Sequence, residues 1–202
     1  MKIMYHVLVI QLFFFIISIN CKGEHNKHQH KMESIEPSGS SLNLLDSHWQ
    51  TEENRNIRIS ELTSKKIQVI SMIFFNCTNV CPRIVADMRY IQSKLSDKSR
   101  GAVEFTLVTV DPDRDTIESF HDFQKKMNIP GWHFLRGNKN DIRELAAVLG
   151  VKYVRLDDGN FTHSNIISVL NKKGEIAYQQ KEIRSNIQET IDAIEFAYSH
   201  PD

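Results

Sequence analysis

The sequence predicts one α/β domain in which a mixed β-sheet is flanked by helices. Two nearly continuous apolar runs, 67–75 and 103–110, have the composition of central strands covered on both faces, and a helical pattern follows each of them. Two further strand-like segments meet across the turn at 171–174, and an amphipathic helix pattern ends the chain. Strand–helix pairs followed by a hairpin and a closing helix favour a mixed sheet.

The individual elements follow from hydrophobic periodicity and turn signals. Pro82 suits the first turn of a helix, Asp115 or Thr116 can cap the next helix, and Gly150 ends a third. The expected elements are an extended segment at 42–49, an alternating segment at 57–59, a turn at 60–62, strands at 67–75, 103–110 and 132–135, helices at 82–97, 116–127 and 140–149, a hairpin of strands at 164–170 and 175–178, and a helix at 185–199. This order is that of a thioredoxin-like fold.

Length and composition narrow the class of protein. The chain has 202 residues, and its 25 basic and 25 acidic side chains balance, so nothing indicates a nucleic-acid partner. Three cysteines are too few for a disulfide scaffold, which makes a closely spaced pair more typical of a reactive or metal-binding site. One domain is expected over residues 42–202.

Residues 1–21 form a predicted export segment. Lys2 precedes an apolar run that is short for a transmembrane helix, and the run ends at Cys21, where a polar stretch begins. This boundary resembles a bacterial lipoprotein signal, in which the cysteine becomes the lipidated first residue. The alternatives are a cleaved signal peptide and an uncleaved anchor in which Cys21 is incidental. All three interpretations place the domain outside the cytoplasm, and the lipoprotein signal, which we favour, anchors it to a membrane of the bacterial cell envelope.

Residues 22–41 are polar and show no periodicity, which is typical of a disordered tether. The segment contains His25, His28 and His30. Neutral imidazoles bind metals, so the tether could collect copper or zinc weakly. The alternative, which we slightly favour, is a solvated linker that happens to be rich in histidine.

Cys77 and Cys81 carry the clearest chemistry, because they lie where the strand at 67–75 gives way to the helix from Pro82. The dipole and free N–H groups of a helix N-terminus favour thiolate over thiol. The spacing lets both sulfurs face one side, where they can hold a soft ion such as Cu(I) or close a disulfide. A purely structural disulfide is the other alternative for an exported protein.

His163 and Asp111 are the next candidates. In the expected topology the segment containing His163 returns beside the helix N-terminus with the cysteines, so His163 could complete a site of two sulfurs and one nitrogen. Asp111 ends the strand at 103–110, on the edge of the sheet where α/β sites gather, and could support His163. Arg114 could pair with the acids of this turn. Helix capping and turn chemistry are the alternative for the acids, and they fully explain Asp115.

Four motifs together resemble the SCO/SenC family, whose members are membrane-tethered, thioredoxin-like copper proteins. The motifs are Cys77-x3-Cys81-Pro82, VTVDPDRDT at 108–116, PGWHFLRG at 130–137, and His163-Ser164. The resemblance covers about residues 42–199. It implies that Cys77, Cys81 and His163 bind copper with Asp111 in support, and that the protein helps to assemble the dinuclear copper centre of cytochrome c oxidase.

Two functions therefore compete. The first is a metallochaperone that binds Cu(I) or Cu(II) and delivers it to an oxidase subunit. The second is a thiol–disulfide oxidoreductase that keeps a partner's cysteines reduced through Cys77 and Cys81. Thioredoxin-type reductants carry Cys-x2-Cys and a proline before the facing strand. Here the spacing is longer, no proline lies between Pro130 and Pro201, and His163 takes that place, which favours copper.

Overall fold

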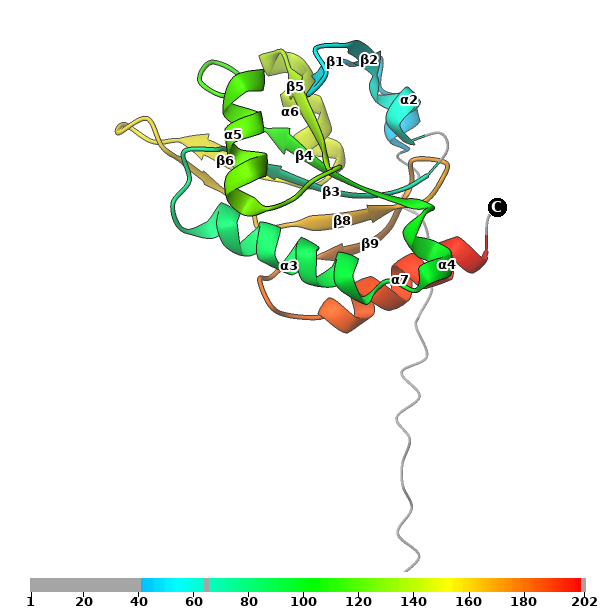
Figure 1. Ribbon diagram of the computed structural model, residues 1–202. Helices are drawn as coiled ribbons and strands as arrows, with labels where there is room; N and C mark the ends of the chain where they lie inside the picture. The colour runs from blue at the N-terminus through cyan, green and yellow to red at the C-terminus, as the bar shows by residue number, and fades with distance from the viewer. Residues whose placement is uncertain (1–40, 64–65, 201–202) are drawn as a thin grey trace, which may run out of the picture. The chain divides into compact units, whose positions relative to one another are not determined.

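Seven strands of the described chain form one mixed sheet in the order β2-β1-β5-β4-β3-β8-β9, and β6 pairs with β7 in a small second sheet (Figure 1). The computed structural model describes residues 41–63 and 66–200. The strands are β1 (His48–Thr51), β2 (Asn56–Arg58), β3 (Ile67–Ile73), β4 (Val103–Thr109), β5 (His133–Gly137), β6 (Tyr153–Arg155), β7 (Phe161–His163), β8 (Ile167–Leu170) and β9 (Ile176–Gln180). The helices are the 3-10 helix η1 (Leu42–Leu44), α2 (Ile59–Thr63), α3 (Val80–Lys94), α4 (Asp97–Arg100), α5 (Ile117–Met127), α6 (Lys139–Val148) and α7 (Ile187–Ser199).

Strands β3, β4 and β5 run parallel at the centre of the sheet, while β1 and β8 pair antiparallel on either side of them. Every residue of β3 is buried. Because successive side chains of a strand point to opposite faces, the sheet is covered on both faces at β3. The predicted mixed sheet, its apolar central strands and the β8–β9 hairpin before the last helix are confirmed.

Helices α3 and α5 hold the chain on either side of the cysteine loop, residues 74–79, which joins β3 to α3. Helix α3 follows that loop directly, and α3 and α7 lie side by side (Figure 1). Helix α5 packs on β5 through the stacked rings of Phe120 and Phe134, whose centroids are 4.4 Å apart. Phe75, two residues before Cys77, lies against the same pair, with its centroid 5.0 Å from that of Phe134. An aromatic cluster therefore anchors the start of the loop.

The turn expected at 60–62 is wrong, because those residues lie within helix α2. The buried side chains of Ile59 and Thr63 are one helical turn apart, so packing of this face favours a helix. The Glu61 carboxylate accepts a hydrogen bond from the Arg58 backbone N–H at 2.9 Å, which satisfies a donor at the start of the helix.

The helix expected to start at Pro82 begins two residues earlier, at Val80, and ends at Lys94 rather than at residue 97. Proline is tolerated there because the first N–H groups of a helix have no partner within it. Helix α4, capped by Ser96, and strands β6 and β7 were not expected, and the opening segment forms η1 before β1. None of the helices in the described part of the chain is long and apolar enough to cross a membrane.

Candidate metal and thiol site

The two cysteines lie on either side of the start of α3. Cys77 is half-buried in the loop after β3, and Cys81 is buried in the first turn of the helix. The Cys81 backbone N–H donates a hydrogen bond to the Cys77 sulfur at 3.3 Å. The residue before the helix, Asn79, makes no capping bond with its side chain, so the Cys77 sulfur does the capping that a serine or aspartate usually provides. Both thiols are free.

The two sulfurs differ in acidity. The contact with the Cys81 side chain lowers the pKa of Cys77 to about 5, helped by the backbone N–H groups of Cys81, Asn79 and Val80 and opposed by burial. The contact with Cys77, together with burial, raises the pKa of Cys81. At neutral pH the pair therefore holds a thiolate on Cys77 and a thiol on Cys81. The thiolate preference expected of a helix N-terminus applies to Cys77 alone.

His163 ends strand β7 and lies beside Cys81, where the topology led us to expect it. Its Nε2 atom is 3.3 Å from the Cys81 sulfur. Its Nδ1 atom is 2.9 Å from the backbone oxygen of Ser164, which can only accept, so Nδ1 carries the proton. In the neutral ring the lone pair of Nε2 then faces the sulfur, which is the tautomer that a metal ligand requires. The edge of the ring packs against Phe74, with centroids 5.9 Å apart.

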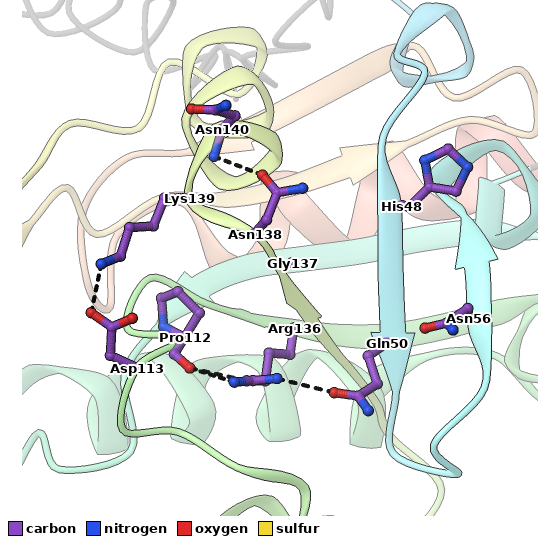
Figure 2. A pocket seen from close by; sticks show the side chains of 10 residues that line it. All are labelled: His48, Gln50, Asn56, Pro112, Asp113, Arg136, Gly137, Asn138, Lys139 and Asn140. Carbon is purple, nitrogen blue, oxygen red and sulfur yellow. Dashed lines mark hydrogen bonds and ion pairs between the residues drawn. The ribbon is translucent and has the colours of Figure 1, made fainter.

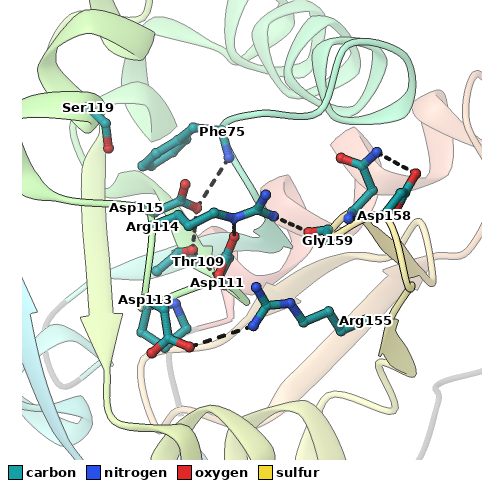
Figure 3. A network of polar contacts seen from close by, with 12 residues as sticks. Phe75, Thr109, Asp111, Asp113, Arg114, Asp115, Ser119, Arg155, Asp158 and Gly159 are labelled. Carbon is teal, nitrogen blue, oxygen red and sulfur yellow. Dashed lines mark hydrogen bonds and ion pairs between the residues drawn. The ribbon is translucent and has the colours of Figure 1, made fainter.

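Asp111 pairs with Arg114 rather than with His163 (Figure 3). Its buried carboxylate pairs with Arg114, and the same guanidinium donates a hydrogen bond to the backbone oxygen of Gly159. Gly159 lies in the turn between β6 and β7, four residues before His163. The expected pairing of Arg114 with an acid of its turn is confirmed. Any influence of Asp111 on His163 passes through Arg114 and this hairpin.

Asp115 has a role that the sequence analysis missed. Thr116 caps α5, so the interpretation of Asp115 as a capping residue is wrong. The buried Asp115 carboxylate accepts hydrogen bonds from the Thr109 hydroxyl at 2.5 Å and from the Phe75 backbone N–H at 3.2 Å (Figure 3). It thereby ties the end of β4 to the start of the cysteine loop. Burial raises the pKa of Asp115 to about 6.

A cavity of about 360 Å³ adjoins Cys77 and His163. Its lining contains no lysine, arginine or carboxylate and is rich in amides: Phe74, Asn76, Cys77, Thr78, Asn79, Val80, Asn160, Phe161, Thr162, His163 and Asn165. Within the described chain, Asn165 Oδ1 is the one buried side-chain oxygen or nitrogen without a hydrogen-bond partner. The sequence offered one signal for this residue, an amide between His163 and the apolar start of β8.

A larger hollow of about 780 Å³ lies elsewhere, beside β1, β5 and the start of α6 (Figure 2). Its cations already have partners. Lys139 pairs with Asp113 at 2.8 Å, and Arg136 donates to the backbone oxygen of Pro112 and to Gln50. These groups satisfy one another, and the hollow contains no thiol, so we assign it no chemistry despite its size.

No three His, Cys, Asp or Glu side chains among residues 41–63 and 66–200 stand in the arrangement of a preformed metal centre. Cys81 and His163 are in contact, and Cys77 borders them with its sulfur turned to the helix N-terminus. A three-donor site that includes Cys77 would require its sulfur to turn away from the Cys81 backbone N–H. A site that assembles with its metal is typical where ligands must first lose protons.

Sequence comparison identifies the family. The SCO1/SenC family model matches residues 40–197. The chain belongs to the SCO1/SenC family. A curated relative, the SCO1 protein homolog of Bacillus subtilis (strain 168), is 27% identical over 101 residues, which cover 48% of this chain and 51% of the relative. The chain thus spans about half the length of this curated SCO1 relative.

Solved SCO structures share the fold. A SCO1/SenC family lipoprotein from Bacillus anthracis str. Ames superimposes with a TM-score of 0.68 at 20% identity, covering 81% of this chain and 98% of that one. Arabidopsis thaliana ScoI, solved with copper bound, gives a TM-score of 0.66 at 18% identity, covering 74% and 96%. At these identities the likeness shows the fold alone, and the predicted thioredoxin-like fold is confirmed.

Several expectations for this SCO1/SenC chain fall outside the described residues. They are the export segment at 1–21 with Cys21, and all of the tether at 22–41 except Ser41, including His25, His28 and His30. The ligand roles of Cys77, Cys81 and His163 stay predictions.

Proposed function

We propose that the domain is a copper metallochaperone that binds its cargo through Cys77, Cys81 and His163 and passes it to a subunit of a respiratory oxidase. The observation that carries the proposal is the 3.3 Å contact between the Cys81 sulfur and the Nε2 atom of His163, beside Cys77, whose pKa is lowered to about 5. Membership of the SCO1/SenC family supports it, as does the copper bound to Arabidopsis thaliana ScoI.

The donor set suits copper. Thiolates prefer Cu(I), and imidazole suits Cu(II). Sulfur and nitrogen atoms that share one ion lie about 3.3–3.7 Å apart, given the bonds of about 2.3 and about 2.0 Å known for zinc and angles of about 100–120°. The observed separation of Cys81 Sγ and His163 Nε2, 3.3 Å, is at the lower end of that range.

Each of the three residues has a distinct task in loading. Cys77 is already deprotonated and half-exposed, so it is the sulfur that incoming copper meets first. Cys81 must lose its proton before its sulfur can bind, which couples loading to proton release. His163 is held in the binding tautomer by Ser164 and needs no rearrangement.

We extend the proposal to the location of the protein. An export signal over residues 1–21, lipidation at Cys21 and a tether at 22–41 would hold the domain at the outer face of a bacterial membrane. The lipoprotein of Bacillus anthracis with the same fold supports this arrangement. An oxidase subunit at the same membrane surface would then be within reach of the copper site.

The deciding experiment is a titration of the reduced protein with Cu(I) and Cu(II). We expect one copper per chain, and we expect His163→Ala to weaken Cu(II) binding at least about tenfold while changing the reduction potential of the dithiol little. His121→Ala is the matched control, since His121 is exposed on α5. Unchanged copper affinity in His163→Ala would rule out the three-ligand site.

A second candidate, a thiol–disulfide oxidoreductase, is favoured by one specific observation. Cys77 is an accessible thiolate with a pKa lowered to about 5, and Cys81 lies behind it as a resolving thiol. Rapid reduction of a disulfide-bonded substrate such as insulin by the metal-free protein, abolished in Cys77→Ser, would favour this function. Slow reduction together with tight copper binding would favour the first.

A further inference from the structure

Asn165 has a feature that folding does not explain. Its Oδ1 atom is the one buried side-chain polar atom without a hydrogen-bond partner in the part of the chain that the structure describes. Buried acceptors without donors destabilise a fold and are rare in native structures. Asn165 also lines the cavity that adjoins Cys77 and His163. An uncompensated oxygen at a candidate site calls for a ligand.

The backbone on both sides of Asn165 is fixed. The Ser164 N–H donates to the backbone oxygen of Lys152 at 2.8 Å, and the Ser71 hydroxyl of β3 donates to the backbone oxygen of Ile166 at 2.8 Å. The side chain of Asn165 is therefore held at the cavity.

The chemistry of the cavity narrows what the oxygen can bind. The lining includes no lysine or arginine, and in the neutral form of the His163 ring the Nε2 atom is an acceptor. A carboxamide oxygen is a donor atom that Cu(II) accepts alongside nitrogen, in tetragonal geometry. Cu(I) is satisfied by two or three soft donors and gains little from an oxygen.

We propose that Asn165 is a further donor of the copper site, and that its carboxamide oxygen binds the Cu(II) form and leaves the Cu(I) form unaffected. The proposal rests on copper binding at Cys77, Cys81 and His163. It makes Asn165 a specificity residue for oxidation state, since a group that stabilises only Cu(II) makes the bound ion harder to reduce.

The test compares Asn165→Leu with the native protein, because leucine has a similar volume and no polar atom. We expect Cu(II) affinity to fall at least about tenfold, Cu(I) affinity to change less than about twofold, and the electron paramagnetic resonance spectrum of Cu(II) to change. Asn165→Asp keeps an oxygen and should retain Cu(II) binding. Asn160→Leu is the matched control, since Asn160 lines the same cavity but its carboxamide already donates to Asp158 at 2.9 Å.

A second readout separates this role from a structural one. Removing an unsatisfied acceptor should leave the melting temperature of metal-free Asn165→Leu unchanged or raise it. A lower melting temperature, equal loss of Cu(I) and Cu(II) binding, or unchanged Cu(II) affinity and spectrum would each overturn the proposal. If Asn165→Leu binds Cu(II) normally while His163→Ala does not, this proposal fails and the metallochaperone stands. If the native protein binds no copper, the proposed function itself fails.

Discussion

Replacing Arg114 with methionine tests how the end of β4 supports the hairpin that carries His163. The Arg114 side chain is 32% exposed, whereas its partner Asp111 is only 1% exposed. The same guanidinium also donates to the backbone oxygen of Gly159 in the β6–β7 turn (Figure 3). Methionine fills most of the volume but leaves a buried carboxylate and a backbone oxygen without their donor.

The magnitude follows from burial. Removing one partner of a fully buried ion pair costs about 3–5 kcal/mol, because the other charge stays in the interior without compensation. Water reaches nearly a third of the Arg114 side chain and screens part of the interaction, so we expect a loss of about 2 kcal/mol in the free energy of unfolding. Arg155→Met is the matched control, since Arg155 belongs to the β6–β7 hairpin that Arg114 contacts. Arg155 faces the exposed Asp113 at 3.8 Å, and we expect no measurable loss.

Urea unfolding at neutral pH measures both variants. Arg114→Met should lower the midpoint without changing the dependence of the unfolding free energy on urea. Adding Asp111→Asn to Arg114→Met should recover part of the loss, because no buried charge then remains. The reasoning is refuted if Arg114→Met unfolds at the same urea concentration as Arg155→Met, or if the double variant is less stable than Arg114→Met.

Two further predictions concern pH. Iodoacetamide should alkylate Cys77 far faster than Cys81 at pH 7, and the alkylation rate should rise with pH around the pKa of Cys77, about 5. Equal labelling of the two cysteines, measured by mass spectrometry, would contradict a thiolate on Cys77. Glu104 and Glu52 raise the pKa of His133 to about 10, so the stability that this pairing gives is complete below pH about 6.5 and is lost as the pH rises through about 10. Between pH 6 and 10 the melting temperature should fall more steeply in the native protein than in His133→Gln, and parallel curves would show that the pairing contributes nothing.

The sequence was informative where one local pattern decides the structure. The apolar run at 67–75 specifies a strand that only a covered central position can accommodate, and β3 occupies that position. The topology then brings distant residues together. Strand β8 runs antiparallel to β3, so the segment before β8, which contains His163, lies near the end of β3, where the loop with Cys77 begins. The proximity of His163 and Cys81 could be predicted in this way.

The hydrogen-bond partners of the acids after β4 could not be predicted from the sequence. Several carboxylates in this turn compete for a few donors, and those donors come from different elements of the fold. Asp111 and Asp115 lie in one turn and look alike in the sequence, yet Asp111 pairs with Arg114 whereas Asp115 reaches across to the backbone of Phe75. Which carboxylate takes which donor depends on where the loop after β3 lies. Asn165 is a stronger case, since its oxygen is unsatisfied only because no hydrogen-bond donor lies beside it in the folded chain, and the sequence does not show this.

The two candidate functions share their first step and separate at His163. Both begin at Cys77, which is deprotonated and half-exposed, so either an incoming copper ion or a partner disulfide would meet the same sulfur. In exchange, the Cys77 thiolate attacks the partner disulfide and releases one partner sulfur as a thiolate, and Cys81, once deprotonated, then attacks the Cys77 sulfur and displaces the second. Holding copper requires in addition a lone pair on the far side of Cys81, and the Nε2 atom of His163 has one at 3.3 Å. Replacing His163 should therefore weaken copper binding while thiol exchange persists. A variant with both properties lost would mean that His163 acts on the acidity of the cysteines rather than on the metal.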